Sequence, residues 1–197
     1  IVEFKNGKAH EQDICENGKF IVINSKFIST DGRVKKYSDK QICPVYENEI
    51  VMVMSDIPNG KAIAKCFLVK NDDRYSLNQR ICGLTAKKNI SISQFLIRII
   101  NRNRSFLRID DGVSQTNLRK DDVLDLSLML PKKIEEQEKI ASFLTAVDEK
   151  ISRLEAKKTQ FEKYKKGVMQ AIFSQKIRFK KPDGASFPDW EEKKLGE

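Results

Sequence analysis

Hydrophobic and polar positions divide the chain into two parts of different character, which meet at Pro131. Before this proline, short apolar runs rich in β-branched and aromatic residues alternate with turn signals, a pattern typical of strands joined by tight loops. After it, residues 132–176 contain no proline and a single glycine, and their apolar residues recur at helical spacing. The pattern predicts an α+β fold, in which a strand-rich globular domain is followed by one long α-helix.

Strands are expected at several places in the first part. The run KFIVINSKFI at 19–28 predicts a strand, and VKKYS at 34–38 can return as its hairpin partner after the Asp-Gly turn in 29–33. Three further strands are expected at 49–55, 61–69 and 76–86.

One helix is expected before Pro131. Ser93 is a candidate N-cap, and the residues from 94 to 109 have helical spacing, with Phe95, Ile99 and Phe106 on or near one face.

The second part carries a heptad repeat, with apolar residues that alternate by three and four positions. This seam consists of Ile140, Leu144, Val147, Ile151, Leu154, Phe161, Val168 and Ile172. Lys158 and Lys165 occupy two seam positions where apolar residues would be expected, and they lower the stability of any pairing. The helix would span roughly 60 Å.

A stripe this narrow and this long needs another helix to cover it, from a second copy or from a second repeat of a longer chain. The alternative, an amphipathic helix lying on its own domain, is possible for the first two turns only. The expected organisation is a globular domain over 1–131, a coiled-coil helix over 132–176, and a linker with the start of a further domain over 177–197.

The formal net charge is +9 and the pI is about 9.3, which suits a polyanion such as nucleic acid or an anionic membrane surface. Residues 132–176 carry eleven Lys or Arg against seven Asp or Glu, and most of the remaining excess lies before them. No apolar run approaches 18 residues and no signal peptide opens the chain, so no membrane association is expected.

Histidine and cysteine are too sparse and too dispersed for a usual metal site. The four cysteines include no C-x-x-C pair, and His10, the single histidine, is expected at the surface. Cys43 and Cys66 lie in apolar runs, where a reduced thiol behaves as a small hydrophobic group. We therefore expect no metal and a reduced, cytoplasmic protein.

Two enzyme motifs are incomplete. Pro182-Asp183 and Glu191-x-Lys193 resemble a nuclease PD…E-x-K pattern, but they lie in a short linker after a helix instead of on adjoining strands. The chain lacks a glycine-rich loop and an Asn/Asp-Pro-Pro-aromatic motif for methyl transfer. We expect no catalytic residue and no cofactor in this chain.

The junction DDGVSQTNLRKDDVLDLSLMLPKKIEEQEKIASFLTAVDEKI at 110–151 combines a Gly-x-x-Gln-x-Asn-Leu turn, a proline and an acidic EEQ triplet that leads into the helix. This arrangement resembles the specificity subunit of type I restriction–modification enzymes. The segments 46–63, 76–81 and 165–197 also resemble parts of that family, so the likeness covers essentially the whole chain.

The resemblance implies a target recognition domain that reads one half of a bipartite double-stranded DNA site. It further implies a non-catalytic chain, whose partners are a methyltransferase subunit and a restriction subunit. Two recognition domains and two helices occur in family members, and the helices pack antiparallel as a spacer. We therefore expect a homodimer or an intramolecular pairing, in a chain that begins just inside one recognition domain and ends at the start of the next.

Polar and basic residues in turns and on the short helix are candidates for DNA contact, because Arg and Lys suit guanine and Asn and Gln suit adenine. The set comprises Lys26, Ser29, Arg33, Lys35, Lys36, Asn59, Lys61, Arg98, Arg102, Gln115, Thr116, Asn117 and Arg119. Arg98 and Arg102, one helical turn apart, are placed to straddle a phosphate. Each residue has a solvated alternative, and Gln115 and Asn117 can equally cap the next helix.

Two other functions fit the same pattern. A coiled-coil assembly scaffold would use its basic domain to bind protein, and a stand-alone dimeric DNA-binding protein, such as a repressor, would need no partner subunits. DNA affinity separates the first alternative from recognition of DNA, and binding of a methyltransferase subunit separates the second.

Overall fold

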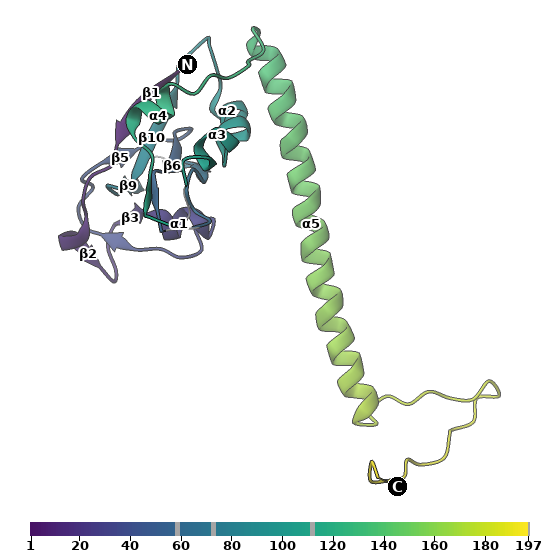
Figure 1. Cartoon of the computed structure of the whole chain (residues 1–197). Coiled ribbons are helices and arrows are strands. Elements are labelled where there is room, and N and C mark those ends of the chain that lie inside the picture. Colours follow the sequence, from purple (N-terminus) through teal and green to yellow (C-terminus); the bar gives the residue numbers. More distant parts are fainter. Residues whose placement is uncertain (58–59, 72–73, 111–112, 197) are drawn as a thin grey trace. The chain divides into compact units, whose positions relative to one another are not determined.

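The computed structural model describes all residues except 58–59, 72–73, 111–112 and 197. The chain forms two compact units, Ile1–Leu144 and Thr145–Glu197. The first unit holds every named strand and the short helices, and the long helix α5 (Ile134–Phe173) begins within it (Figure 1). The α+β fold class, a strand-rich domain followed by a long helix, is confirmed. The domain boundaries predicted from the sequence, including the one at 131/132, stay a proposal.

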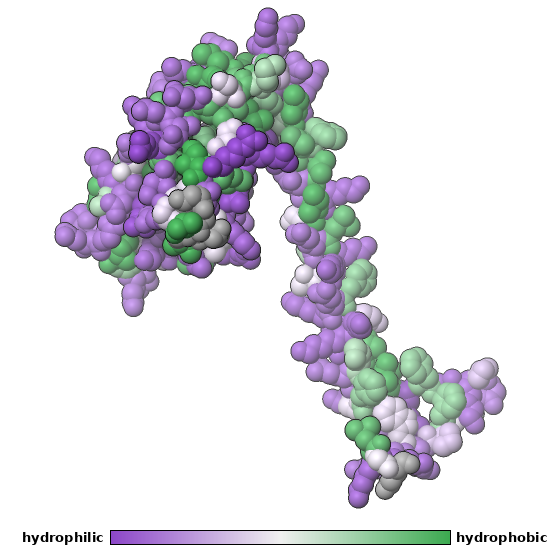
Figure 2. Space-filling model, in the orientation of Figure 1, coloured by the Kyte–Doolittle hydropathy of each residue, from purple (hydrophilic) through white to green (hydrophobic). Residues whose placement is uncertain are grey.

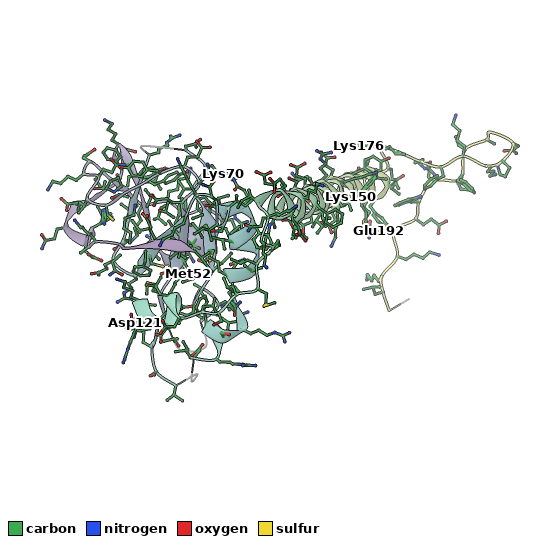
Figure 3. The ribbon with its side chains drawn as sticks, turned by 90° about the horizontal axis from the view of Figure 1, so that it is seen from above. Met52, Lys70, Asp121, Lys150, Lys176 and Glu192 are labelled. Atoms are coloured by element: carbon green, nitrogen blue, oxygen red, sulfur yellow. The ribbon has the colours of Figure 1, made fainter. Side chains whose placement is uncertain are left out.

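A four-stranded antiparallel sheet forms the centre of the first unit. Its strand order is β1-β10-β6-β8, with bounds β1 (Val2–Asn6), β10 (Ile81–Ala86), β6 (Ile50–Val53) and β8 (Cys66–Leu68). All four residues of β6 are buried, including Met52, which is labelled in Figure 3. An apolar run without alternation is what a strand covered on both faces requires.

A second sheet has five short strands in the order β2-β4-β3-β9-β5. Their bounds are β2 (Ile14–Cys15), β4 (Tyr37–Ser38), β3 (Phe20–Ile23), β9 (Tyr75–Leu77) and β5 (Pro44–Val45). β3 and β9 pair in parallel, whereas the other pairs are antiparallel. A separate two-stranded ribbon joins β7 (Ser55–Asp56) to β11 (Thr116–Asn117).

Short helices cover the sheets at several points. They are a 3-10 turn (Glu11–Asp13), α1 (Ser25–Ser29), α2 (Ser93–Ile100), α3 (Arg104–Leu107) and α4 (Lys120–Leu124). α1 contributes Phe27 and Ile28 to one apolar core, where the Phe27 ring meets Phe67 edge-on. α2 and α3 contribute Leu96 and Phe106 to the other.

The strand predicted at 19–28 is correct only for its first half. β3 ends at Ile23, and Asn24 then begins α1, since its side-chain oxygen accepts a hydrogen bond from the Phe27 N–H at 2.9 Å. Asparagine favours this N-cap position, and the cap outweighs the β propensity of the residues that follow. The predicted return strand is confirmed at Tyr37–Ser38, which pairs antiparallel with β3.

Two other strand predictions need correction in their length. The run 76–86 is two strands, β9 and β10, which belong to different sheets and are separated by a turn at 78–80. The run 61–69 is a strand only from Cys66 to Leu68. Residues 61–64 instead form a loop that the Asp56 carboxylate holds by accepting from the N–H groups of Ala62 and Ile63.

The single helix predicted at 94–109 is in fact two helices. α2 ends at Ile100, and α3 begins at Arg104 with Asn103 as its N-cap. Arg102 lies between them with φ of 55°, a left-handed conformation that interrupts an α-helix. Ser93 is not the cap of α2, because Ile92 holds that position and Ser93 is buried.

The prediction that His10 lies at the surface is wrong, because the residue is only 1% exposed. Nδ1 lies 2.6 Å from the Lys8 carbonyl oxygen and Nε2 lies 2.7 Å from Ser76 Oγ. A carbonyl only accepts, so Nδ1 carries a proton and donates to Lys8, and Nε2 shares a hydrogen bond with the Ser76 hydroxyl. Ser76 Oγ also accepts from the Cys43 N–H, which completes a buried polar network.

All four cysteines are free, and their burial predicts an order of reactivity. Burial raises the pKa of Cys82 to about 12 and raises the pKa of Cys66 well above its ordinary value. Both thiols therefore stay protonated and unreactive at pH 8. Cys15 also has a raised pKa, from desolvation and from nearby Asp39, but it is only half-buried.

We expect iodoacetamide at pH 8 to modify Cys15 first, whereas Cys66 and Cys82 react only after the domain unfolds. Mass spectrometry of tryptic peptides, with and without guanidinium, measures this order. Equal labelling of all four thiols in the native protein would contradict the burial of Cys66 and Cys82.

Helix α5 is 40 residues long and confirms the long helix predicted from the heptad pattern. Only Gln137 and Ala141 are buried along it, both in its first turns. Val147, Ile151, Leu154 and Phe161 of the predicted seam are 40–59% exposed. Figure 2 shows hydrophobic residues among hydrophilic ones along this helix. Pairing of the seam with another helix stays a prediction.

The residues after α5 form a loop that Arg178 holds together. Its guanidinium pairs with Asp189 at 2.9 Å and donates to the Phe187 carbonyl at 3.1 Å. The Trp190 ring meets Phe173, the last residue of α5, edge-on at 6.4 Å between ring centroids. These contacts fold the loop back against the end of its own helix.

Candidate nucleic-acid interface

An open polar hollow of about 570 Å³ lies in the first unit, where several distant segments meet. The hollow is defined here by its lining residues: Asn6, Met54, Ser55, Gln79, Arg80, Gln115, Asn117, Leu118, Arg119 and Lys120. Amide, hydroxyl and cationic side chains predominate among them. These are the groups that contact phosphates and base edges in protein–DNA complexes.

Backbone hydrogen bonds of Met54 bring two walls of the hollow together. The Met54 N–H donates to the Arg80 carbonyl at 3.0 Å, and the Met54 carbonyl accepts from the Leu118 N–H at 2.7 Å. One residue just after β6 thus fixes both the turn at 78–80 and the segment that leads into α4. Gln115 adds a side-chain link, since its amide donates to Ser55 Oγ at 2.6 Å.

A close backbone approach places the end of β1 in the same hollow. The Gly7 N–H donates to the Ile81 carbonyl at 3.0 Å, and a Cβ at Gly7 would overlap the backbone of Asn78. Only glycine leaves room for this contact. Asn6, the preceding residue, therefore lies beside the turn that carries Gln79 and Arg80.

Cationic side chains give the hollow its positive charge. Arg80, Arg119 and Lys120 are exposed, and within the described part of the chain no carboxylate forms an ion pair with any of them. The Asp122 carboxylate, which is close by, accepts from the backbone N–H of Arg119 at the start of α4 and not from its guanidinium. Surface cations that converge on one hollow without a carboxylate partner can neutralise phosphates.

Three of the four residues predicted at the junction turn line the hollow: Gln115, Asn117 and Arg119. Neither Gln115 nor Asn117 caps α4, whose N-cap is Arg119, so the capping alternative is not observed. Asn117 donates to the Gln115 carbonyl instead. The fourth residue, Thr116, does not line the hollow: it is buried, and its hydroxyl donates to the Asp110 carboxylate at 2.8 Å.

The residues predicted around the first hairpin lie elsewhere, and none lines the hollow. Lys26 and Ser29 are on α1, where the Ser29 hydroxyl donates to the Lys26 carbonyl. Arg33 donates to the Thr30 carbonyl, which shapes the turn. Lys35 and Lys36 are exposed.

The predicted phosphate pair of Arg98 and Arg102 does not have the expected geometry, because α2 ends between them. Arg102 donates to the carbonyl oxygens of Lys61 and Ile63 at 3.0 and 3.2 Å, so it supports the loop at 61–64. Arg98 and Lys61 are exposed. Asn59, also predicted to contact DNA, lies outside the described residues.

Seven of the ten lining residues were not predicted from the sequence, and those among them with amide or cationic side chains are Asn6, Gln79, Arg80 and Lys120. Gln79 and Arg80 fall inside a run whose pattern predicts a single strand. Asn78 is a turn signal that could have identified both as candidates. Asn6 and Lys120 carry no local signal, because only the strand pairing and the Met54 hydrogen bonds bring them there.

The described residues contain no group of three or more His, Cys, Asp or Glu that could hold a metal ion. The two carboxylates of the nuclease-like motif contact protein groups near them in the chain. Asp183 accepts a hydrogen bond from the Ala185 N–H, and Glu191 Oε2 lies 3.4 Å from Lys193 Nζ of the same motif. Among the described residues, no helix is both long enough and apolar enough to cross a lipid bilayer.

Comparison with solved structures gives the fold. The chain is similar to the S subunit of a type I restriction-modification system from M. genitalium, with a TM-score of 0.57 and 19% identity over 88% of this chain. It is also similar to a chain in a structure of type I R-M complex assembly and conformational transition, with a TM-score of 0.68 and 12% identity over 89% of this chain. The chain spans 44% and 43% of the lengths of these two chains.

Comparison with family models gives the family. Residues 1–163 match the model described as "Type I restriction modification DNA specificity domain". This range includes the whole first unit, the hollow and most of α5. The chain therefore belongs to the type I restriction modification DNA specificity domain family.

Proposed function

We propose that this chain reads one half of a bipartite double-stranded DNA site, and that the hollow makes the base and phosphate contacts. Family membership makes the chain a DNA-recognition component and not an enzyme. The observation that carries the assignment of the hollow is the convergence of three cations and four amide side chains on one open surface. Arginine and lysine suit guanine and phosphate, and asparagine and glutamine suit adenine.

The partners are a methyltransferase subunit and a restriction subunit of the same system. The similar structures support this proposal, because one of them concerns complex assembly of the type I R-M system. In such an assembly this chain selects the site, and the methyltransferase acts on a base flipped out of the duplex.

The seam of α5 pairs with another helix, antiparallel and two-fold symmetric when the partner is a second copy. The exposed apolar residues support this, since a stripe from Val147 to Phe161 loses contact with water only against a neighbour. The relatives, about twice as long as this chain, provide room for a second unit of the same kind. A pair of units would present two DNA-reading surfaces.

DNA binding by the wild-type chain tests the proposal. Selection from a randomised duplex pool identifies the preferred sequence, and fluorescence anisotropy then compares that duplex with a scrambled one at about 50 and about 200 mM salt. We expect tighter binding to the selected duplex at both concentrations and a steep decrease in affinity with salt. A single unit binds more weakly than a linked pair, so protein concentrations up to about 100 µM are needed.

Equal affinity for selected and scrambled duplexes would contradict sequence recognition by this chain alone. Absence of any binding, together with self-association, would favour the assembly scaffold. Capture of a methyltransferase subunit from the same system would separate the proposed role from that of a stand-alone dimeric DNA-binding protein.

A further inference from the structure

Gln137 is the most deeply buried polar residue of α5, with 0% of its surface exposed. Its side chain makes three hydrogen bonds to backbone groups. Oε1 accepts from the Ile92 N–H at 3.2 Å, and Nε2 donates to the carbonyl oxygens of Ile90 and Pro131 at 3.0 Å each. Both N–H groups of the amide are thus used, so the side chain is held in one orientation.

These three bonds join separate parts of the first unit. Ile90 and Ile92 belong to the loop between β10 and α2, and Pro131 belongs to the segment before α5. No side chain within α2 caps its N-terminus, and the Gln137 oxygen accepts from the Ile92 N–H at that position instead. One turn later Ala141 is buried as well, so two successive turns of α5 face the domain.

Only an amide side chain of this length satisfies all three backbone groups. Methionine has a similar shape but would remove the hydrogen-bond partner of two carbonyls and one N–H at a partly buried contact, which destabilises that contact. Glutamate would place carboxylate oxygens against the carbonyls of Ile90 and Pro131, which are acceptors themselves. The site therefore has a strict chemical requirement at a helix position that is otherwise mostly exposed.

Helix α2 extends this attachment to a second loop of the domain. Just after the end of α2, the Asn101 side chain accepts from the Cys66 N–H at 2.9 Å, and Arg102 holds the carbonyls of Lys61 and Ile63. Gln137 is therefore hydrogen-bonded to the start of α2, and Arg102, just after the end of α2, contacts the loop at 61–64. The Asp56 carboxylate of β7 holds the same loop.

We propose that Gln137 is a positioning residue, which holds the first turns of α5 to the recognition domain and thereby sets the base-pair spacing at which two paired units bind DNA. This inference rests on the proposed function, because spacing has meaning only for two DNA-reading units joined by their helices. Without the three hydrogen bonds, the helix would leave the domain in a range of directions, and one spacing would no longer be preferred.

A DNA-independent experiment tests the positioning itself. Nitroxide labels on Thr85→Cys and Lys150→Cys, in a Cys15→Ser background, report the distance between β10 and α5 by pulsed electron resonance. Dilution with unlabelled protein restricts the signal to one chain. We expect Gln137→Met to at least double the width of the distance distribution, and the matched control Gln160→Met, on an exposed part of α5, to leave it unchanged. Equal widths for wild type and Gln137→Met would overturn the proposal.

A second experiment measures how Gln137 affects the preferred spacing between two DNA half-sites. Duplexes carry two selected half-sites separated by a series of spacings, one base pair apart. Wild type should bind one spacing at least about ten-fold more tightly than its neighbours, whereas Gln137→Met should bind all spacings within about three-fold. Both proteins should bind a single half-site within about two-fold of each other. If Gln137→Met is less stable than wild type but prefers the same single spacing, Gln137 stabilises the fold and does not set the spacing.

The two experiments separate this inference from the proposed function. If wild type binds no half-site, the proposed function fails, and the distance distribution still decides the role of Gln137. If wild type binds half-sites and Gln137→Met keeps a narrow distribution and a single spacing, only the positioning role fails. Thermal unfolding of the variant confirms that the domain is folded at the temperature of both measurements.

Discussion

If the seam of α5 pairs two copies of the chain as proposed, replacement of Leu154 and Phe161 by aspartate will convert that dimer to a monomer. The two side chains are 56% and 59% exposed in the single chain, and in a two-fold pair both copies of each would be buried. Burial of one such side chain stabilises by about 1.5–3 kcal/mol, so removing four of them raises the dissociation constant by at least about a thousand-fold. Sedimentation equilibrium over a range of concentrations measures the change.

An apolar substitution in the same seam should have the opposite effect on dimerisation. Lys158 occupies a seam position and is exposed, with a 4.0 Å ion pair to Glu162. Lys158→Leu should therefore tighten the dimer, because an apolar residue then completes the stripe. Lys163→Asp, on the face of α5 away from the seam, is the control and should leave the association unchanged. A wild-type protein that sediments as a monomer at high concentration would contradict the pairing.

Replacement of Arg80 and Arg119 by alanine will weaken binding to the selected duplex and lower its salt dependence. Each arginine that contacts a guanine bidentately contributes about 1–3 kcal/mol, whereas each lost phosphate contact reduces the slope of log affinity against log salt by about 1. The expected loss for both together is about 10²–10⁴-fold. Anisotropy titrations at several salt concentrations, on selected and scrambled duplexes, distinguish base contact from phosphate contact.

Two controls accompany the double variant. Lys163→Ala removes one positive charge from α5, outside the hollow, and should change the affinity for DNA by less than about two-fold. Arg102→Ala removes an arginine that supports the loop at 61–64 through two carbonyls, so it should lower the unfolding temperature and leave the salt slope unchanged. An unaltered affinity in the Arg80→Ala, Arg119→Ala protein would exclude the hollow as the DNA-reading surface.

Helix α5 was predictable because its signal is local and repeated. Apolar residues from Ile140 to Ile172 follow one heptad rule, and no residue from 132 to 176 other than Gly167 strongly disfavours a helix. β6 was predictable for a similar reason, since four consecutive apolar residues indicate a fully covered strand. The junction motif at 110–151 indicates the family for the same reason, because its residues are contiguous in the chain.

Short elements were predicted less well, because single residues decide them. Asn24 converts the second half of an expected strand into α1, and Arg102 in a left-handed conformation divides an expected helix into two. Asn24 could have been recognised, since asparagine is among the most favoured N-caps. A left-handed arginine has no such signal, because the carbonyls of Lys61 and Ile63 that hold its side chain belong to a segment distant in the chain.

The amino-acid sequence by itself determined the α+β class, the long helix with its apolar seam, the basic character and the family. These properties depend on neighbouring residues or on composition, so they can be read along the chain. Only the tertiary structure decided that His10 is buried, that Gln137 joins three segments, and that Asn6, Arg80 and Lys120 share one hollow. Each of these depends on backbone groups that are distant in the chain, and such pairings become visible only when the sheets have formed.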